Sequence, residues 1–241
     1  MERSLPKLEI QYGWRLPIIG SHAQFFLKIF ALALMLSDHI HLVFFHRQLE
    51  WLYWLSRLVF PIFALTVAQN LELHHANPKR YISRLVFYGV LAQPVYMICF
   101  QTTQINVLFT LASSIALHWI LDALKARGLI WSLRWGLAIF LASSLPRLEF
   151  GWAGVLAVPV FVALMRRGAW WDWLFAFVLA FGIVKFTSPW LMPLIAIAFW
   201  ISCSRFKEAR VLNQPRWLRH AFYLFYPIHL ALIVVFREIV H

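Results

Sequence analysis

Residues 25–45 read FFLKIFALALMLSDHIHLVFF, a predominantly apolar segment that is long enough to cross a lipid bilayer as one helix. It is longer than the apolar core of a signal peptide, and no small-residue cleavage site follows it. We therefore expect this segment to remain in the chain as a membrane anchor. It is the first of a series of similar segments.

The composition of the whole chain also indicates a membrane protein. Of its 241 residues, 62% are hydrophobic and 13% are charged. Soluble domains are about half apolar and a quarter charged, so this chain has too little polar surface to cover a soluble globule. The sequence predicts an all-α fold, a polytopic bundle of about nine transmembrane helices. The segments that can span are 25–45, 51–70, 84–100, 106–122, 129–146, 150–165, 171–186, 189–203 and 217–236.

The short connections between these segments leave no room for a second folded unit. We expect residues 1–24 to form a cytoplasmic N-terminal segment and residues 25–241 to form a single transmembrane domain. The links that follow residues 146 and 186 are very short. The two segments joined by either link can therefore form a re-entrant hairpin instead of two full spans.

The basic residues fix the predicted orientation, because cytoplasmic loops retain Lys and Arg. Fifteen of them lie in the connections on one side of the predicted bundle, and three lie on the other side. This alternation predicts that the N-terminus is cytoplasmic and the C-terminus is outside. The net charge of +12 falls in small groups between apolar segments and forms no continuous face, so nucleic acid is not an expected partner. Membrane lipids are.

Polar side chains interrupt three of the predicted spans. Asp38 and His39 lie in the first span, Arg57 in the second, and Tyr226 and His229 in the last. Ionisable groups within a membrane are costly unless they face the interior of the bundle, so they are candidates for function. At about 1.5 Å of rise per residue, Asp38, Arg57 and His229 reach a similar level in the outer half of the bilayer.

These residue types suit general acid–base catalysis of an acyl transfer. His229 or His39 can take a proton from an attacking amine or hydroxyl, and Asp38 can orient that histidine. A contact between Asp38 and His229 is as plausible as a pair within one helix. Arg57 can stabilise the developing oxyanion or a phosphate of the donor.

Simpler roles compete with these assignments. Asp38 and Arg57 can neutralise each other as a buried pair, a frequent fate of charges inside a membrane. Tyr226 is a candidate catalytic group, but aromatic packing explains it equally well. Asn106 and Glu149 lie at outer ends of spans, where we expect them to bind the substrate.

The sequence shows no pattern typical of a metal site or a disulfide framework. Its two cysteines, Cys99 and Cys203, lie within or at the end of apolar segments, where free cysteines usually pack in the core. We expect no metal. One alternative is haem held between His39 and His229, which lie at a similar depth.

Six blocks of sequence extend across nearly the whole chain after residue 25. They are KIFALALMLSDHIHL at 28–42, RLVFPIFAL at 57–65, Asn70-Leu71, NVLF at 106–109, EFGWAG at 149–154 and FYLFYPIHL at 222–230. Their ordered combination resembles the TraX family of conjugative pilin acetylases, which are encoded on plasmids. The first 24 residues carry no part of this resemblance.

The resemblance implies a bacterial inner-membrane enzyme that acetylates the N-terminus of a mature pilin subunit, with acetyl-CoA as donor. Asp38 and His39 match the family's Asp-His, Arg57 matches its arginine, and His229 matches its C-terminal histidine. The donor is cytoplasmic and the predicted site faces outward. The loop residues Arg84, Arg205 and Arg219 are therefore expected to hold the donor's phosphates, while its pantetheine arm passes between helices.

Two other functions fit the same residues. One is an O-acyltransferase that acts on a glycan or a lipid. The other is a transporter or pilin-insertion factor that uses the buried charges as a relay. The mass of the pilin tests the first alternative, and release of free CoA tests the second.

Overall fold

The structure of the protein is a computed structural model, which describes residues 14–45, 48–73, 76–145, 147–183, 192–205 and 216–240. These residues are helical apart from short connections and one isolated bridge between Ile105 and Leu148. The helices are α1 (Ser21–Phe45), α2 (Glu50–Ser56), α3 (Val59–Leu73), α4 (Pro78–Phe100), α5 (Val107–Ala126), α6 (Trp131–Ser143), α7 (Gly151–Arg166), α8 (Trp170–Ile183), α9 (Met192–Cys203) and α10 (Arg216–Val240).

The predicted all-α fold is confirmed, and each predicted span contains helix in the part of the chain described above. The second span is broken into α2 and α3 at Arg57 and Leu58. Arg57 caps the C-terminus of α2, where its backbone N–H donates to the Trp54 carbonyl at 3.1 Å. Pro61 lies in the first turn of α3, where a missing N–H costs no helical hydrogen bond.

Among the described residues, five helical segments are long and apolar enough to cross a membrane, so the chain is a multi-pass membrane protein. They are α1, the broken segment Glu50–Leu73, α4, α5 and residues 220–239 of α10. Helices α6 to α9 have 12 to 16 residues. At about 1.5 Å per residue they are shorter than the ~30 Å hydrocarbon core. The orientation of the bundle stays a prediction.

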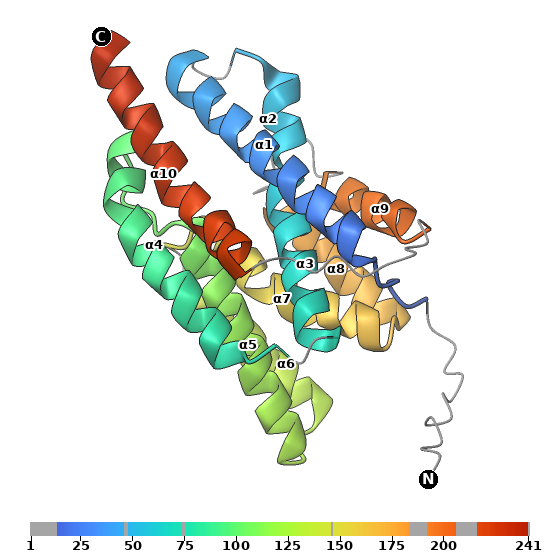
Figure 1. Ribbon diagram of the computed structural model, residues 1–241. Coiled ribbons are helices and arrows are strands. Elements are labelled where there is room, and N and C mark those ends of the chain that lie inside the picture. Colours follow the sequence, from blue (N-terminus) through green and yellow to red (C-terminus); the bar gives the residue numbers. More distant parts are fainter. Residues whose placement is uncertain are drawn as a thin grey trace.

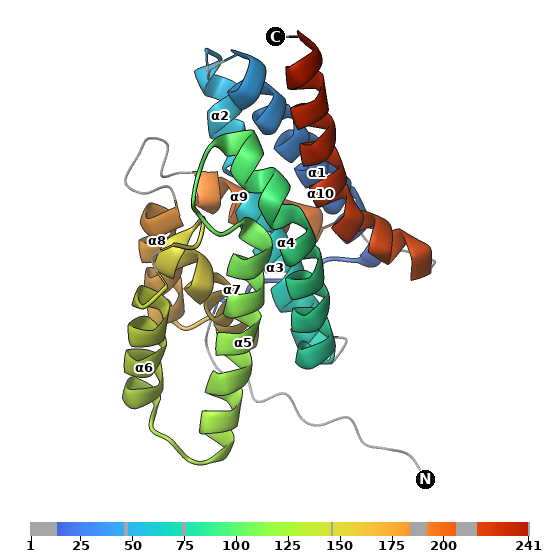
Figure 2. The ribbon, with the colours of Figure 1, turned by 90° about the vertical axis from the view of Figure 1, so that its left-hand side faces the viewer.

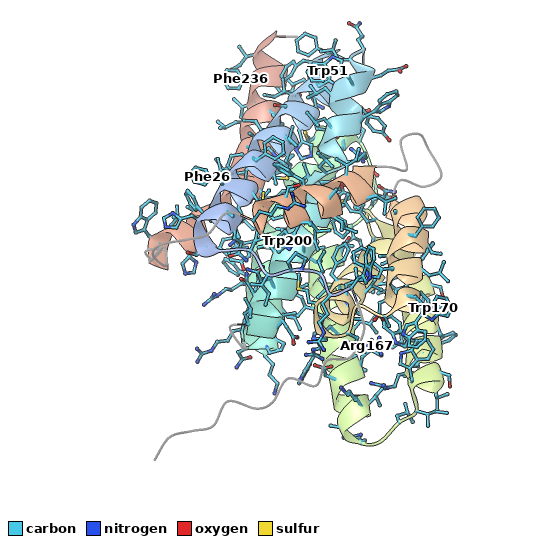
Figure 3. The ribbon with its side chains drawn as sticks, turned by 90° about the vertical axis from the view of Figure 1, so that its right-hand side faces the viewer. Phe26, Trp51, Arg167, Trp170, Trp200 and Phe236 are labelled. Atoms are coloured by element: carbon cyan, nitrogen blue, oxygen red, sulfur yellow. The ribbon has the colours of Figure 1, made fainter. Side chains whose placement is uncertain are left out.

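The outer surface is apolar and aromatic, as contact with lipid requires. Phe26, Trp51, Trp170 and Phe236 are exposed and point away from the bundle (Figure 3). Trp51 and Phe236 lie toward one end of the molecule and Trp170 toward the other, the arrangement of interfacial aromatic belts. Trp200 is different, because it is buried and its indole N–H donates to the Pro17 carbonyl at 2.9 Å.

Six helices form a closed ring. Following contacts from neighbour to neighbour, the order is α1, α3, α7, α5, α4, α10 and back to α1. Figures 1 and 2 show α4 lying between α5 and α10, with α6 and α8 on the far side of α7. Residues at the ends of the chain, in α1 and α10, therefore lie side by side in the ring.

Residues 14–24, which belong to the predicted cytoplasmic N-terminal segment, pack into this bundle. Leu16 and Ile19 are buried, and the Leu16 N–H donates to the Leu164 carbonyl at 3.0 Å. The side chain of Gln69 in α3 accepts from the Ile19 N–H at 2.9 Å and donates to the Ile19 carbonyl at 2.8 Å. Residues 1–13 of the predicted segment lie outside the described residues.

Gly154 lets α7 approach its neighbours in the ring. A Cβ atom at this position would lie 2.5 Å from Thr110 Cγ2 in α5 and 3.3 Å from Phe60 Cζ in α3. Because Gly154 has no side chain, α7 can pack closely against both α5 and α3 at this position.

A cluster of charged side chains around Arg166 joins the same three helices at the C-terminal end of α7. Arg166 Nε donates to Glu72 Oε2 at 2.6 Å, and its two terminal nitrogens donate to the Asp122 carboxylate at 2.9 and 3.2 Å. His118 lies 3.5 Å from the same carboxylate. All three nitrogens of the Arg166 guanidinium are thus hydrogen-bonded.

Candidate active site

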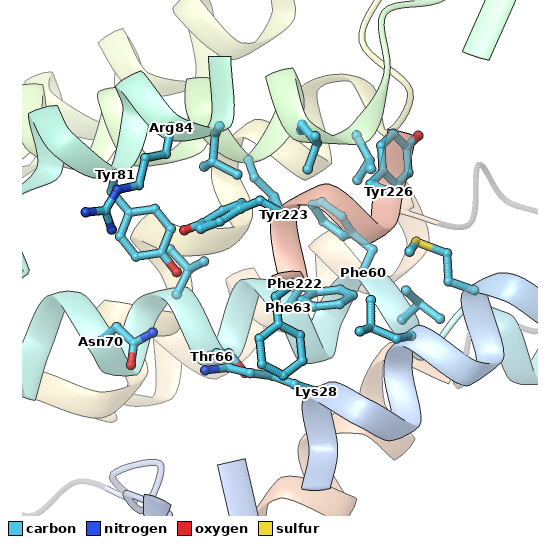
Figure 4. Close-up of a pocket in the computed structure, with 18 of the residues that line it drawn as sticks. Lys28, Phe60, Phe63, Thr66, Asn70, Tyr81, Arg84, Phe222, Tyr223 and Tyr226 are labelled. Carbon is cyan, nitrogen blue, oxygen red and sulfur yellow. The ribbon is translucent and has the colours of Figure 1, made fainter. Parts of the chain in front are cut away.

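A partly open cavity of about 640 Å³ lies inside the ring of helices. It is lined by residues from α1, α3, α4, α5 and α10, by Ser56 and Arg57 at the break between α2 and α3, and by the loop before α7. One end is basic, and Figure 4 shows Arg84 and Tyr81 there beside Asn70. Tyr226 and Phe60 lie at the opposite end. Five of the predicted site residues line that second end: Asp38, His39, Arg57, Glu149 and Tyr226.

Arg57 is held from three sides at the break between α2 and α3. Its Nη2 donates to Asp38 Oδ2 at 3.0 Å and to Ser56 Oγ at 3.2 Å, and its guanidinium lies 4.5 Å from the centre of the Tyr53 ring. Its Nε is buried and has no hydrogen-bond partner among the described residues. Asp38 therefore neutralises Arg57, as one sequence alternative predicted, and Arg57 keeps one buried donor available.

His39 and His229 form a hydrogen-bonded pair between α1 and α10. His39 Nδ1 lies 2.8 Å from His229 Nε2, and the rings are stacked with centroids 5.0 Å apart. His229 Nδ1 lies 2.7 Å from the Phe225 carbonyl oxygen. His229 thus pairs with His39, whereas Asp38, the other partner the sequence suggested, pairs with Arg57.

Tyr226 and Glu149 complete this end of the cavity. The Tyr226 hydroxyl is buried beside Val107 at the start of α5 and interacts with the Glu149 carboxylate. Glu149 also interacts with Tyr96 in α4. A short parallel contact positions Glu149, whose backbone N–H donates to the Ile105 carbonyl at 3.0 Å. Glu149 and Tyr226 therefore line the cavity next to the charged pair, with the Tyr226 hydroxyl itself buried.

Asn106 lies outside the cavity lining of the described chain. It is buried as the N-cap of α5, where its Oδ1 accepts from the Leu108 N–H at 3.0 Å. Its Nδ2 donates to the Gly89 carbonyl at 2.9 Å and to Gln93 Oε1 at 2.8 Å. These bonds tie α5 to α4, so the geometry of Asn106 is that of a structural cap.

The three arginines predicted to hold the donor lie in different places. Arg84 lines the basic end of the cavity. Arg205 is exposed and is not among the lining residues, and the side chain of Arg219 lies outside the described residues. Lys28 and Arg80 also line the basic end, and the sequence reasoning missed them. Lys28 could have been found, because it is the other charged residue beside Asp38 in residues 25–45.

The geometry leaves no space for haem iron between the two histidines. An ion bonded to both imidazoles would separate their nitrogens by about 4 Å, twice a metal–nitrogen bond of ~2.0 Å. The observed separation is 2.8 Å. Within the described ranges, no group of three or more His, Cys, Asp or Glu residues is arranged to hold a metal ion.

The fold and the site define a multi-pass helical membrane protein whose polar cavity, inside a ring of helices, combines a histidine pair with a charged Arg–Asp pair. Residues 23–237 match the family model described as TraX protein, and the chain belongs to the TraX family. The resemblance seen in the sequence is thereby confirmed.

Two relatives support this assignment. The chain is 30% identical to the probable fimbrial assembly protein FimC, serogroup H1, of Dichelobacter nodosus, over 87% of this chain and 93% of that protein. It is 39% identical to the protein TraX of Escherichia coli, over 36% of this chain and 35% of that protein. No solved structure matches the chain.

Proposed function

We propose that this protein is an acyltransferase of the bacterial inner membrane, which acetylates the N-terminal amine of a pilin subunit with acetyl-CoA as donor. The observation that carries the proposal is the meeting of His39, Arg57 and Asp38 at one end of the cavity inside the ring of helices. The family, and a relative named for fimbrial assembly, support a role in pilin processing.

The site contains the groups that acyl transfer needs. One histidine of the His39–His229 pair takes the proton of the attacking amine. Arg57, whose Nε–H is buried without a partner among the described residues, stabilises the oxyanion that forms on the thioester carbonyl. Asp38 holds Arg57 in place, since its carboxylate accepts from Nη2. Glu149 and Tyr226 line the space left for the acceptor.

The opposite end of the cavity suits the donor. Lys28, Arg80 and Arg84 supply positive charge there, which binds the phosphates of a nucleotide. Lys28 lies ten residues before Asp38 on α1, a rise of about 15 Å. In the predicted orientation the basic end faces the cytoplasm, where acetyl-CoA is found. The donor would bind at that end, with its pantetheine arm extending through the cavity toward His39.

The other end suits a pilin. A pilin subunit that awaits assembly is anchored in the inner membrane, and leader removal exposes its new N-terminus on the outer side. In the predicted orientation His39 and Arg57 lie in the outer half of the bilayer. The amine of the acceptor therefore enters from the side opposite to the donor.

The intact mass of the cognate pilin tests the proposal. Pilin is compared from cells with the protein, without it, and with the variants Arg57→Gln and Arg205→Gln. We expect a mass gain of one acetyl group that requires the protein and Arg57 but not the exposed Arg205. A pilin whose mass never changes would refute pilin acetylation. An acetyl group found instead on a glycan or lipid would identify an O-acyltransferase.

A further inference from the structure

The two histidines of the site are not equivalent, because hydrogen-bond partners determine where each ring carries its protons. His229 Nδ1 lies 2.7 Å from the Phe225 carbonyl oxygen. A carbonyl oxygen only accepts hydrogen bonds, so His229 Nδ1 carries a hydrogen. In the neutral form of His229, Nε2 therefore holds a lone pair.

This lone pair fixes the tautomer of His39. His229 Nε2 lies 2.8 Å from His39 Nδ1, and a hydrogen bond at this distance needs one donor and one acceptor. His39 Nδ1 is therefore the donor when both rings are neutral. The remaining ring nitrogen of His39, Nε2, then has a lone pair and no hydrogen.

The two rings also differ in their access to the cavity. His39 is one of the residues that line it, together with Asp38 and Arg57. His229 lies behind His39, stacked on the Phe225 ring with centroids 4.8 Å apart, and is absent from the described lining. A proton that arrives from the cavity meets His39 first.

We infer that His39 Nε2 is the base of the reaction and that His229 is a positioning residue, which fixes the His39 tautomer and shares the positive charge. This assignment rests on the proposed acyl transfer and names which histidine performs its proton step. The sequence alone left either histidine as the base.

The proton balance of the step is complete. As the amine nitrogen bonds to the thioester carbonyl carbon, one of its protons moves to His39 Nε2. The charge of the imidazolium is shared with His229 when the Nδ1 proton of His39 shifts along the hydrogen bond to His229 Nε2. When the carbon–sulfur bond breaks, the proton returns and leaves from His39 Nε2 with the thiolate. The products are the amide and the free thiol of CoA.

Three substitutions separate the two roles. His39→Asn retains a side-chain amide that can donate to His229 but has no basic nitrogen. His229→Gln places an amide oxygen near the position of Nε2, so it can still accept from His39 Nδ1. His229→Leu removes that acceptor. Each purified variant is assayed in lipid nanodiscs with acetyl-CoA and a peptide of the pilin N-terminus.

We expect His39→Asn to lower the rate of transfer by 100-fold or more, in the range of about 10²–10⁴ that a general base contributes. His229→Leu also loses most of its activity, and His229→Gln restores it to within about tenfold of the wild type, since a replaced acceptor preserves the tautomer. Full activity of His39→Asn or of His229→Leu would overturn the assignment. So would a folded His229→Gln that is as inactive as His39→Asn.

Magnetic resonance of ¹⁵N-labelled histidine in the wild-type protein tests the tautomers without any variant. We expect the two hydrogen-bonded rings both to carry their protons on Nδ1. A His39 protonated on Nε2 beside a doubly protonated His229 would contradict the assignment. A wild-type protein that transfers no acetyl group would refute the proposed function itself, whatever the tautomers are.

Discussion

Arg57 and Arg166 both lie between helices of the bundle beside carboxylates, but their guanidinium groups have different partners. Arg166 donates from all three of its nitrogens, to Glu72 and Asp122. Arg57 donates from Nη2 to Asp38 and Ser56, and its Nε is buried without a partner in the described structure. Arg57 lines the cavity, whereas Arg166 is absent from the lining described for it.

This difference separates a structural charge from a reactive one. An arginine whose three guanidinium nitrogens all donate to carboxylates holds its neighbours together, as Arg166 does. An unsatisfied buried donor costs free energy, about 1–3 kcal/mol, and such a cost is typically retained where function uses the group. The clusters differ in burial, since the Arg57 side chain is 20% exposed and that of Arg166 is 35% exposed. They differ further in that every guanidinium nitrogen of Arg166 has a partner, whereas Nε of Arg57 has none among the described residues.

The largest expected effect is on Arg57. Arg57→Lys keeps the positive charge beside Asp38 but removes Nε and the planar fork. We expect the rate of acetyl transfer per folded protein to fall by about 10²–10³-fold, the usual cost of one oxyanion donor. Transfer kinetics with the pilin peptide measure it. Wild-type rates would show that the free Nε has no catalytic role and would remove the contrast with Arg166.

Arg166→Gln should show the opposite pattern. It leaves the carboxylates of Glu72 and Asp122 without their shared cation, so we expect a loss of stability of about 1–3 kcal/mol, since the cluster is partly exposed. Transfer per folded protein should stay close to that of the wild type. Thermal inactivation in nanodiscs, beside Arg205→Gln as control, measures the first effect. A strong loss of transfer at normal stability would contradict a purely structural role.

The smallest effect is expected at the basic end of the cavity. Lys28→Met removes one of three cations there and retains an apolar stem of similar length. We expect KM for acetyl-CoA to rise by about fivefold with kcat nearly unchanged, because the lost contact is equal in the ground and transition states. A change in kcat alone would contradict this assignment, because it would give Lys28 a role in the chemical step, as proposed for Arg57.

The sequence predicted the helices well, whereas the depth of the site in the bilayer stays a prediction. Apolar segments define spans of known rise, so Asp38, Arg57 and His229 could be placed at one depth from spacing. Their partners could not be predicted, because hydropathy does not determine which helices are neighbours or how each is rotated about its axis. The pairing of Asp38 with Arg57 was only one of two alternatives, and the His39–His229 contact was not distinguished.

Local hydrogen bonding explains the other differences. Asn106 is a polar residue at the predicted outer end of a span, which suggested contact with substrate. Its side chain instead hydrogen-bonds to Leu108 N–H, as the cap of α5, and to Gln93. Lys28 and Arg80 come together only because α1 and α4 border the same cavity. Both features depend on tertiary neighbours, which a single sequence does not display.

Acetyl transfer by the purified wild-type protein in lipid nanodiscs tests the central claim most directly. Acetyl-CoA labelled in its acetyl group is mixed with a peptide of the mature pilin N-terminus, and amide and free CoA thiol are both quantified. The account predicts that the two products appear in equal amounts and only with the protein. A folded protein that releases no thiol and labels no peptide would contradict it.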